Sequence, residues 1–243
     1  MTDSQEPVFG FTRTELRDRN TVYAPGLFQD QTVVVTGAGG GLGLAIAALF
    51  ARLGARLAIC GRNPEKLESA AEFLRSFGGE VMAREMTIRD PEQVAAFVDA
   101  VHERFGGLNV LVNNAGGQFP QPALDFSIKG WNAVIDTNLN GTWWMMQAVA
   151  KNWVETGTQG NIVSIVADVW RGMPGIAHTA AARAGVIFLS KSVAVEWAPY
   201  GVRVNCVAPG CCESTGFGNY PAEGAATFKE SNPMRRAGDE WDV

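Results

Sequence analysis

The sequence contains little positive charge and no long apolar run. Its 243 residues carry 20 Lys and Arg against 25 Asp and Glu, a net charge of -5, which leaves no electrostatic footprint for a nucleic-acid partner. No stretch approaches the roughly 18 apolar residues of a membrane span, and residues 1–20 lack the apolar segment of a secretory signal. We therefore expect a cytoplasmic protein with no membrane span and no nucleic-acid partner.

Cysteine and histidine are scarce, and their spacing argues against two further kinds of site. The cysteines show no C-x-x-C spacing, and two of them are adjacent, which disfavours a disulfide between that pair. The two histidines are isolated, so they form no ligand cluster for zinc. The residues in question are Cys60, Cys206, Cys211, Cys212, His102 and His178. We expect structural or incidental cysteines and no metal site.

What the sequence does contain is a regular alternation of β-rich runs and helical patterns. Three segments, 42–54, 64–78 and 91–106, repeat apolar residues at helical spacing, and two of them begin with proline, which suits the first helical position. This alternation predicts an N-terminal arm (1–30) and a single α/β domain (31–243), a Rossmann-type doubly wound parallel sheet with helices on both faces. The β-rich runs begin at Thr32, Ala55, Val81, Asn109, Asn161 and Val202.

The carboxyl-terminal part departs from this pattern, because no apolar strand follows the run at 202–208. We expect a sheet that lacks its last strand, with the run at 202–208 at its edge. The glycine-rich segment 211–228 carries Phe217, Tyr220 and Phe228. A lid over the substrate and an ordinary surface loop both fit that segment.

The run at 32–36 leads directly into TGAGGGLG, a glycine-rich turn that precedes a helical segment. Glycines let the backbone approach a phosphate closely, and the amino terminus of the following helix supplies free N–H groups and a positive dipole end. The spacing is Thr-Gly-x-x-x-Gly-x-Gly, through Thr36, Gly37, Gly41 and Gly43, with Leu42 between the last two glycines. The turn predicts the pyrophosphate site of a dinucleotide.

The second β-rich run ends in AICGRN and favours one dinucleotide over the other. The acidic residue expected to bind the ribose of NAD is missing at Gly61, and Arg62 stands beside it. A guanidinium can hold a 2′-phosphate through paired, charge-assisted hydrogen bonds. The alternative for Arg62 is a solvated loop cation. We predict NADP (NADPH) as the cofactor.

Further motifs follow in a fixed order: NNAGG at 113–117, DTNLNGT at 136–142 and NCVAPG at 205–210. With the glycine loop they resemble the short-chain dehydrogenase/reductase family along almost the whole chain. The stretches VYAPGLFQDQ, VNNAGGQF, KGWNAVIDTNLNGT, HTAAARAGV and EWAPYGVRVNCVAPG are similar to the peroxisomal trans-2-enoyl-CoA reductases and, more distantly, to the 2,4-dienoyl-CoA reductases. The resemblance implies an NADPH-dependent reductase of carbon–carbon double bonds in acyl thioesters, acting in fatty acid metabolism as a homotetramer.

The resemblance also implies roles for individual residues. It puts the three loop glycines at the pyrophosphate and Arg62 at the 2′-phosphate, and it makes Asn138 the family's active-site asparagine within a helix. The remaining cofactor contacts that it implies are Asn114 with its neighbours Ala115 and Gly116 near the adenine-side ribose, and Pro209 and Gly210 beside the nicotinamide.

The departures from the family pattern are equally informative. The catalytic serine of the family aligns near Ala167, and its Tyr-x-x-x-Lys signature aligns on Thr179 and Arg183. Residues four apart share a face of a helix, so Thr179 and Arg183 can point together into the cofactor cleft. A standard carbonyl reductase mechanism cannot be assumed for this chain.

The altered residues suit reduction of a carbon–carbon double bond better than reduction of a ketone. A threonine hydroxyl is a far weaker acid than tyrosine, and arginine keeps its proton. Thr179 can instead donate a hydrogen bond to the oxygen of an enolate, while Arg183 would bind the ribose hydroxyls or the diphosphate. His178 is a possible proton donor, although a partly exposed structural histidine is the favoured interpretation.

Two rival hypotheses stay open at this stage. One is an NADP-dependent alcohol, aldehyde or ketone dehydrogenase with a substitute acid. The other is an NADP-binding regulatory or structural subunit without catalysis, which the joint loss of Ser, Tyr and Lys would permit.

Overall fold

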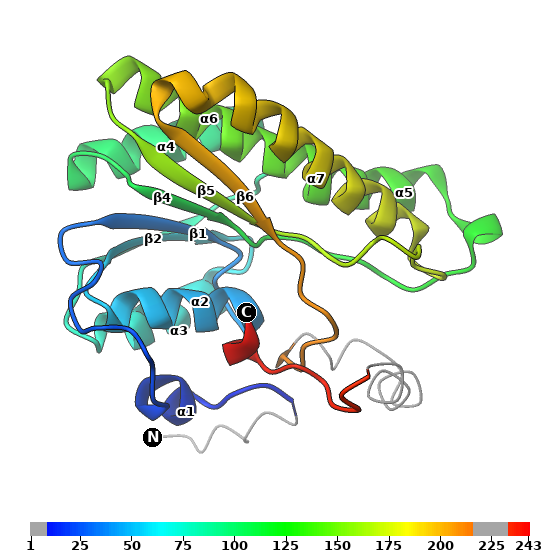
Figure 1. The fold of residues 1–243 in the computed structure, drawn as a ribbon, viewed down its shortest axis with the longest axis horizontal. Coiled ribbons are helices and arrows are strands. Elements are labelled where there is room, and N and C mark those ends of the chain that lie inside the picture. Colours follow the sequence, from blue (N-terminus) through cyan, green and yellow to red (C-terminus); the bar gives the residue numbers. More distant parts are fainter. Residues whose placement is uncertain (1–8, 216–232) are drawn as a thin grey trace.

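A computed structural model describes residues 9–215 and 233–243, and its centre is a parallel sheet of six strands (Figure 1). The strand order is β3-β2-β1-β4-β5-β6, so the chain reverses direction across the sheet between β1 and β4. The predicted Rossmann-type sheet is thereby confirmed. The strands are β1 (Thr32–Thr36), β2 (Arg56–Gly61), β3 (Val81–Glu85), β4 (Val110–Asn113), β5 (Gly160–Ile165) and β6 (Val202–Val207).

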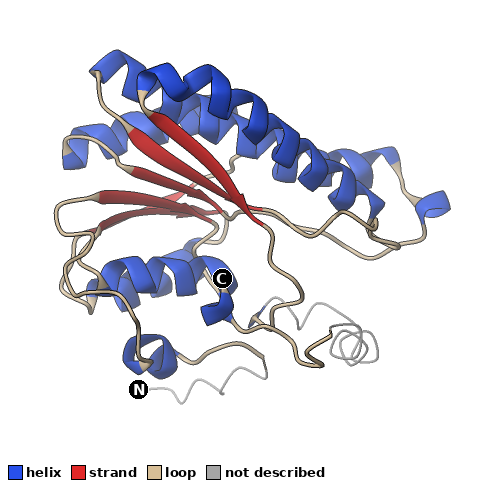
Figure 2. Ribbon diagram, in the orientation of Figure 1, coloured by secondary structure: helices blue, strands red, loops and turns tan. Residues whose placement is uncertain are grey.

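Helices cover both faces of this sheet (Figure 2). One face carries α2 and α3, with α1 of the arm beyond them, and the other face carries α4, α6 and α7. The helices are α1 (Arg13–Asp18), α2 (Gly41–Arg52), α3 (Pro64–Arg75), α4 (Pro91–Phe105), α5 (Ile128–Ile135), α6 (Gly141–Thr156) and α7 (Ala177–Trp197). Short turns of other helical types are η1 (Ala123–Asp125), η2 (Asp136–Asn140), η3 (Ala198–Tyr200) and η5 (Glu240–Asp242).

The two faces of the sheet build two separate apolar cores, because successive side chains of a strand point to opposite faces. Val33 and Val35 of β1 belong to the core under α2 and α3. Val34, between them, belongs to the core under α4, α6 and α7. Trp153 of α6 is fully buried in the second core, and its indole N–H donates to the Leu108 carbonyl at 2.7 Å.

Local sequence signals explain where α3 and α4 begin. Pro64 and Pro91 occupy the first helical positions, where the missing N–H costs nothing. The side chains of Asn63 and Asp90 cap these helices by accepting backbone N–H groups of the first turn. These starts agree with the sequence prediction.

The carboxyl-terminal part runs from β6 back toward the amino-terminal arm. Among the described residues no strand pairs with the outer edge of β6, as expected from the sequence. The chain instead ends in η5, which contacts α2 on the same side of the sheet as α1 (Figure 1). Phe217, Tyr220 and Phe228, proposed above as parts of a lid, lie outside the described residues. Within the parts of the chain that the structure describes, none of the helices combines the length and the hydropathy needed to cross a bilayer.

Candidate active site

The carboxyl ends of the first four strands open into one cleft of about 1360 Å³. The glycine loop between β1 and α2 forms one wall of the cleft, and the β2–α3 turn (60–63) forms another. Residues 86–88 after β3 and 114–116 after β4 complete the sheet side, while residues 10–16 of the arm close the opposite side. Pockets for small ligands measure ~300–1,000 Å³, so this cleft has room for an extended dinucleotide.

The glycines of the loop meet two different physical needs. Gly37 and Gly41 line the cleft and have φ angles of 69° and 54°, which side chains disfavour. A Cβ at Gly37 would also lie 2.9 Å from the Cα of Ala115. Gly43 is buried below the loop, and a Cβ there would collide with the side-chain nitrogen of Asn114. Gly43 is therefore required by packing, while Gly37 and Gly41 expose the backbone to a ligand.

The first turn of α2 suits an anion, as the sequence predicted. Its N-cap is Gly40, which has no side chain to occupy the free N–H groups of that turn. Leu42 lies in the same turn but does not line the cleft. A pyrophosphate at this turn, which stays a prediction, would meet backbone groups and not the Leu42 side chain.

Thr36 and Asn114 lock the ends of β1 and β4 together. The Thr36 hydroxyl oxygen accepts the backbone N–H groups of Asn114, at 3.0 Å, and Ala115, at 2.9 Å. The Asn114 side-chain nitrogen donates to the carbonyls of Thr36, at 3.0 Å, and Gly37, at 3.3 Å. Asn114 therefore braces the glycine loop, and its contact with a ribose, which stays a prediction, would use the amide oxygen.

Two exposed cations border the cleft where β2 leads into α3. Arg62 and Lys66 both line it, and neither takes part in an ion pair with another described residue. The Lys66 backbone N–H donates to the side-chain oxygen of Asn63 at 2.8 Å, which fixes this turn. Arg62 was predicted from the sequence, whereas Lys66 was not. The signal that could have identified Lys66 is its position four residues after Arg62, in the first turn of the helix that begins at Pro64.

A second polar cluster lies where β4 and β5 end. The Asn138 side chain makes a paired contact with the backbone of Gly117, accepting its N–H and donating to its carbonyl, both at 2.9 Å. The Arg183 guanidinium donates to the Ile165 carbonyl at 2.8 Å. A Cβ at Gly116 would collide with this guanidinium and lie 3.0 Å from the Asn138 oxygen. Gly116 thus lets Asn138 and Arg183 come close together.

Asn138 lies in a local departure from α-helical geometry. Asn138 lies within a helical run, as predicted, in the π-helical turn η2 (Asp136–Asn140) that joins α5 to α6. The close approach of Gly141 to Ile88, where a Cβ would lie 2.7 Å from the isoleucine side chain, fits such a widened turn. Single π-helical turns are frequent at functional sites.

Arg183 brings a positive charge into the protein interior. Burial lowers the pKa of Arg183 to about 10, so the side chain stays protonated at neutral pH. None of the ion pairs among the described residues includes Arg183. A desolvated cation without a carboxylate partner favours negative charge on a ligand next to it.

Thr179 and His178 occupy the first turn of α7, and both are buried. Contrary to the prediction that Thr179 and Arg183 point into the cofactor cleft, neither of them lines it. The Thr179 residue is 2% exposed, and its hydroxyl lies 3.4 Å from Nδ1 of His178. The same Nδ1 accepts the Thr179 backbone N–H at 2.8 Å. Phe119 and Phe126 pack against the imidazole, with ring centroids 4.7 Å and 4.4 Å away.

The expectation of a partly exposed His178 is wrong, because the side chain is fully buried. No local signal in the sequence indicates this burial, because Phe119 and Phe126 come from a segment more than fifty residues earlier. Burial also lowers the pKa of His178, and its Nε2 has no hydrogen-bond partner among residues 9–215 and 233–243. A buried imidazole that is neutral at physiological pH is a poor proton donor, which weakens that role for His178.

The remaining predicted residues follow β5 and β6. Ala167 is half-buried two residues after the end of β5, at the position of the family's serine. Pro209 and Gly210 follow β6, and a Cβ at Gly210 would meet no atom within 4 Å. Neither Pro209 nor Gly210 lines the cleft, so their place beside a nicotinamide stays a prediction.

Comparisons with known proteins agree with this architecture. The family model described as short chain dehydrogenase matches residues 31–223. The chain belongs to the short-chain dehydrogenase family. Members of this family are oxidoreductases that use a nicotinamide cofactor, NAD or NADP.

Individual relatives cover most of the chain. A Bacillus subtilis protein named "Probable 2,4-dienoyl-CoA reductase" is 38% identical over 88% of this chain and 87% of its own length. The peroxisomal 2,4-dienoyl-CoA reductase of Danio rerio is 36% identical over 91% of this chain and 75% of its own. Among solved structures, the citronellol catabolism dehydrogenase AtuB of Pseudomonas aeruginosa PAO1 is 39% identical, with a TM-score of 0.81, covering 92% of this chain and 87% of its own.

Proposed function

We propose that this short-chain dehydrogenase is an NADPH-dependent reductase of the carbon–carbon double bond in 2-enoyl or 2,4-dienoyl CoA thioesters. The observation that carries the proposal is the buried Arg183 guanidinium beside Asn138, at a position where a ketone reductase would need a proton-donating pair. The names of the relatives from Bacillus subtilis and Danio rerio support the same substrate class.

The cleft fits the proposed cofactor. Gly37 and Gly41 would admit the pyrophosphate to the backbone, and the uncapped first turn of α2 would bind it. Arg62 and Lys66 supply positive charge at the end of β2, where a 2′-phosphate would lie. When bound, the reduced cofactor supplies a hydride.

The chain's own residues would stabilise the negative charge that follows hydride addition. Once the β-carbon of the enoyl group has gained a hydride, the electron pair of the double bond moves toward the thioester oxygen and forms an enolate. Thr179 would donate a hydrogen bond to that oxygen, and Arg183 would do the same instead of making the ribose or diphosphate contact expected from the sequence. A donor of this kind lowers the barrier by ~3–4 kcal/mol. Water would return a proton to the α-carbon, so no tyrosine is required.

The test is consumption of NADPH with trans-2-enoyl-CoA and 2,4-dienoyl-CoA substrates over a range of acyl lengths. We expect turnover with these thioesters and none with simple ketones. Product analysis by mass spectrometry should show two added hydrogens. No turnover at any acyl length would overturn the proposal.

A second candidate function is oxidation of an alcohol or aldehyde with a substitute acid. The likeness to a protein named as a citronellol catabolism dehydrogenase supports it. Reduction of NADP by a branched alcohol, together with inactivity toward both classes of CoA thioester, would favour this candidate. Binding of NADPH without any turnover would instead favour a subunit that has no catalytic role.

We further propose that the protein acts as a homo-oligomer in the cytoplasm. Phe188 and Val195 lie seven residues apart on one face of α7 and are 67% and 78% exposed. Exposed apolar side chains aligned on one helix suit contact with a second copy. Light scattering of the purified protein measures the assembly, and a monomer would contradict this part of the proposal.

A further inference from the structure

The amino-terminal arm contributes a positively charged side chain to the cleft. Arg13, in α1, donates through Nη2 to the Ser69 hydroxyl at 2.6 Å and to the Ser69 carbonyl at 3.1 Å. Its guanidinium lies over the ring of Phe73, 5.4 Å from the centroid. Both partners belong to α3, so Arg13 fastens the arm to the helix that follows β2.

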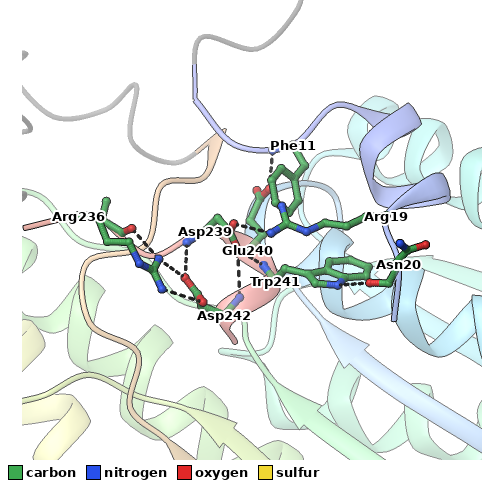
Figure 3. A network of polar contacts seen from close by, with 9 residues as sticks. Phe11, Arg19, Asn20, Arg236, Asp239, Glu240, Trp241 and Asp242 are labelled. Atoms are coloured by element: carbon green, nitrogen blue, oxygen red, sulfur yellow. Dashed lines mark hydrogen bonds and ion pairs between the residues drawn. The ribbon is translucent and has the colours of Figure 1, made fainter. Parts of the chain in front are cut away.

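The arm is held in this place from its other side as well (Figure 3). The Glu240 carboxylate of η5 accepts the Phe11 backbone N–H, and Arg19 pairs with Asp239 at 3.0 Å. The Trp241 indole N–H donates to the Asn20 carbonyl at 3.2 Å.

The arm also has its own local order. Thr12 and Glu15 form a capping box at the start of α1, and Leu16 is buried in the core under α2 and α3. Segments from both ends of the chain therefore position Arg13.

Arg13 stands next to the cations at the end of β2. Lys66 and Ser69 lie three residues apart on α3, so they share a face of that helix and are about one turn, ~5 Å, apart along its axis. Arg62 precedes the same helix, and Arg13 is bonded to Ser69. All four residues line the cleft. The three cations, Arg13, Arg62 and Lys66, therefore lie along one edge of the cleft.

Positive charge at this edge is not neutralised by the described part of the chain. The carboxylates that line the cleft, those of Glu15 and Glu240, are already engaged by the backbone N–H groups of Thr12 and Phe11. Ion pairs among the described residues include none of the three cations. Three exposed cations without an ion-pair partner among the described residues, beside a dinucleotide cleft, suit a dianion.

We propose that Arg13 completes the pocket for the 2′-phosphate, so that the amino-terminal arm is part of the cofactor site and favours NADPH over NADH. The inference rests on the proposed use of NADPH. The inference adds Arg13 to the proposed NADPH site, and this residue lies outside the β–α units of the sheet. The preference for NADPH would depend on Arg62, Lys66 and Arg13 together.

The chain offers a matched control in Arg17, which lies one turn further along α1. Arg17 also lies over Phe73, at 5.8 Å, and donates to a serine beside α3, Ser76, at 3.1 Å. Unlike Arg13, it does not line the cleft. Arg13→Ala and Arg17→Ala therefore remove the same kind of packing, and only the first removes a charge from the cleft.

The experiment is calorimetric titration of the full chain and both variants with 2′,5′-ADP and with 5′-AMP. We expect Arg13→Ala to weaken binding of 2′,5′-ADP about tenfold, the worth of one hydrogen bond to a charged group, and to change binding of 5′-AMP less than about twofold. Arg17→Ala should leave the ratio of the two affinities unchanged. Thermal unfolding of both variants reports any loss of arm packing.

Three results would overturn the inference, and they separate it from the proposed function. An unchanged ratio in Arg13→Ala, or an equal loss for both nucleotides, would mean that Arg13 only fastens the arm. A similar change in Arg17→Ala would assign the effect to packing. If the unaltered chain itself fails to prefer 2′,5′-ADP, the proposed use of NADPH fails together with the inference. If it does prefer 2′,5′-ADP but reduces no enoyl-CoA, only the proposed reaction fails.

Discussion

The cofactor cleft, here the cofactor half of the site, and the cluster of Asn138, Thr179 and Arg183 beside it, the proposed catalytic half, differ in how closely they follow the family pattern. Around β1 and β2 the glycine loop keeps the residues that its geometry demands, and Gly43 tolerates no side chain. Around β5 and α7 the serine, tyrosine and lysine of the family are replaced at Ala167, Thr179 and Arg183. The glycine loop of the cofactor half is limited by sterics, whereas the proposed catalytic half depends on side-chain chemistry that can change on an unchanged scaffold.

The largest expected effect is in the catalytic half. Arg183→Met removes the guanidinium that lies beside Asn138, and we expect kcat for enoyl-CoA to fall about 100-fold or more. Arg62→Met, in the cofactor half, should instead raise KM for NADPH with little effect on kcat. Steady-state kinetics with each substrate varied in turn separates the two parameters. A dominant effect of Arg183→Met on KM for NADPH would assign that residue to cofactor binding.

The next effect concerns the packing of the cofactor half. A Cβ at Gly43 would lie 2.5 Å from the Gly37 carbonyl oxygen, so Gly43→Ala should lower the free energy of unfolding by about 1–3 kcal/mol and weaken NADPH binding. The control is Gly117→Ala in the catalytic half, because a Cβ at Gly117 meets no atom within 4 Å. Urea unfolding of both variants measures the difference. Equal stability of the two variants would contradict the steric explanation.

A smaller effect is expected at Asn138. Asn138→Ala removes both hydrogen bonds to the Gly117 backbone, which should cost about 0.5–1.5 kcal/mol of stability for each bond and lower kcat. Asn138→Asp keeps an acceptor for the Gly117 N–H but no donor for its carbonyl, and should lie between Asn138→Ala and the unaltered chain. A kcat unchanged in Asn138→Ala would show that this paired contact does not support catalysis.

The smallest effect is a pH dependence of stability from His178. Burial lowers its pKa below the ordinary 6.5, so the unfolded chain binds this proton more readily than the folded one. The contribution of His178 to stability is therefore full above about pH 6.5 and is lost as the pH falls toward the folded pKa, at less than ~1.4 kcal/mol for each pH unit.

Thermal unfolding of His178→Gln from about pH 7.5 to pH 5 checks this expectation. The difference between the variant and the unaltered chain isolates His178 from Glu240, whose raised pKa acts in the opposite direction over its own range. A constant difference across the pH range would rule out titration of His178.

Much of the cofactor half could be predicted because its signals are local. Pro64 and Pro91 mark helix starts through their own backbone geometry, and the glycine loop is a continuous segment. The burial of His178 could not be predicted, because Phe119 and Phe126 lie more than fifty residues earlier in the chain. The bracing role of Asn114 depends in the same way on the carbonyls of β1.

The sequence by itself determined the alternation of strands and helices, the glycine loop and the loss of the family's proton-donating pair. Each of these depends only on adjacent residues or on fixed spacings along the chain. Only the tertiary structure decided that Arg183 lies beside Asn138 and that Arg13 reaches the cofactor cleft. The physical reason is that parallel strands bring their carboxyl ends to one edge, where residues far apart in sequence come close together.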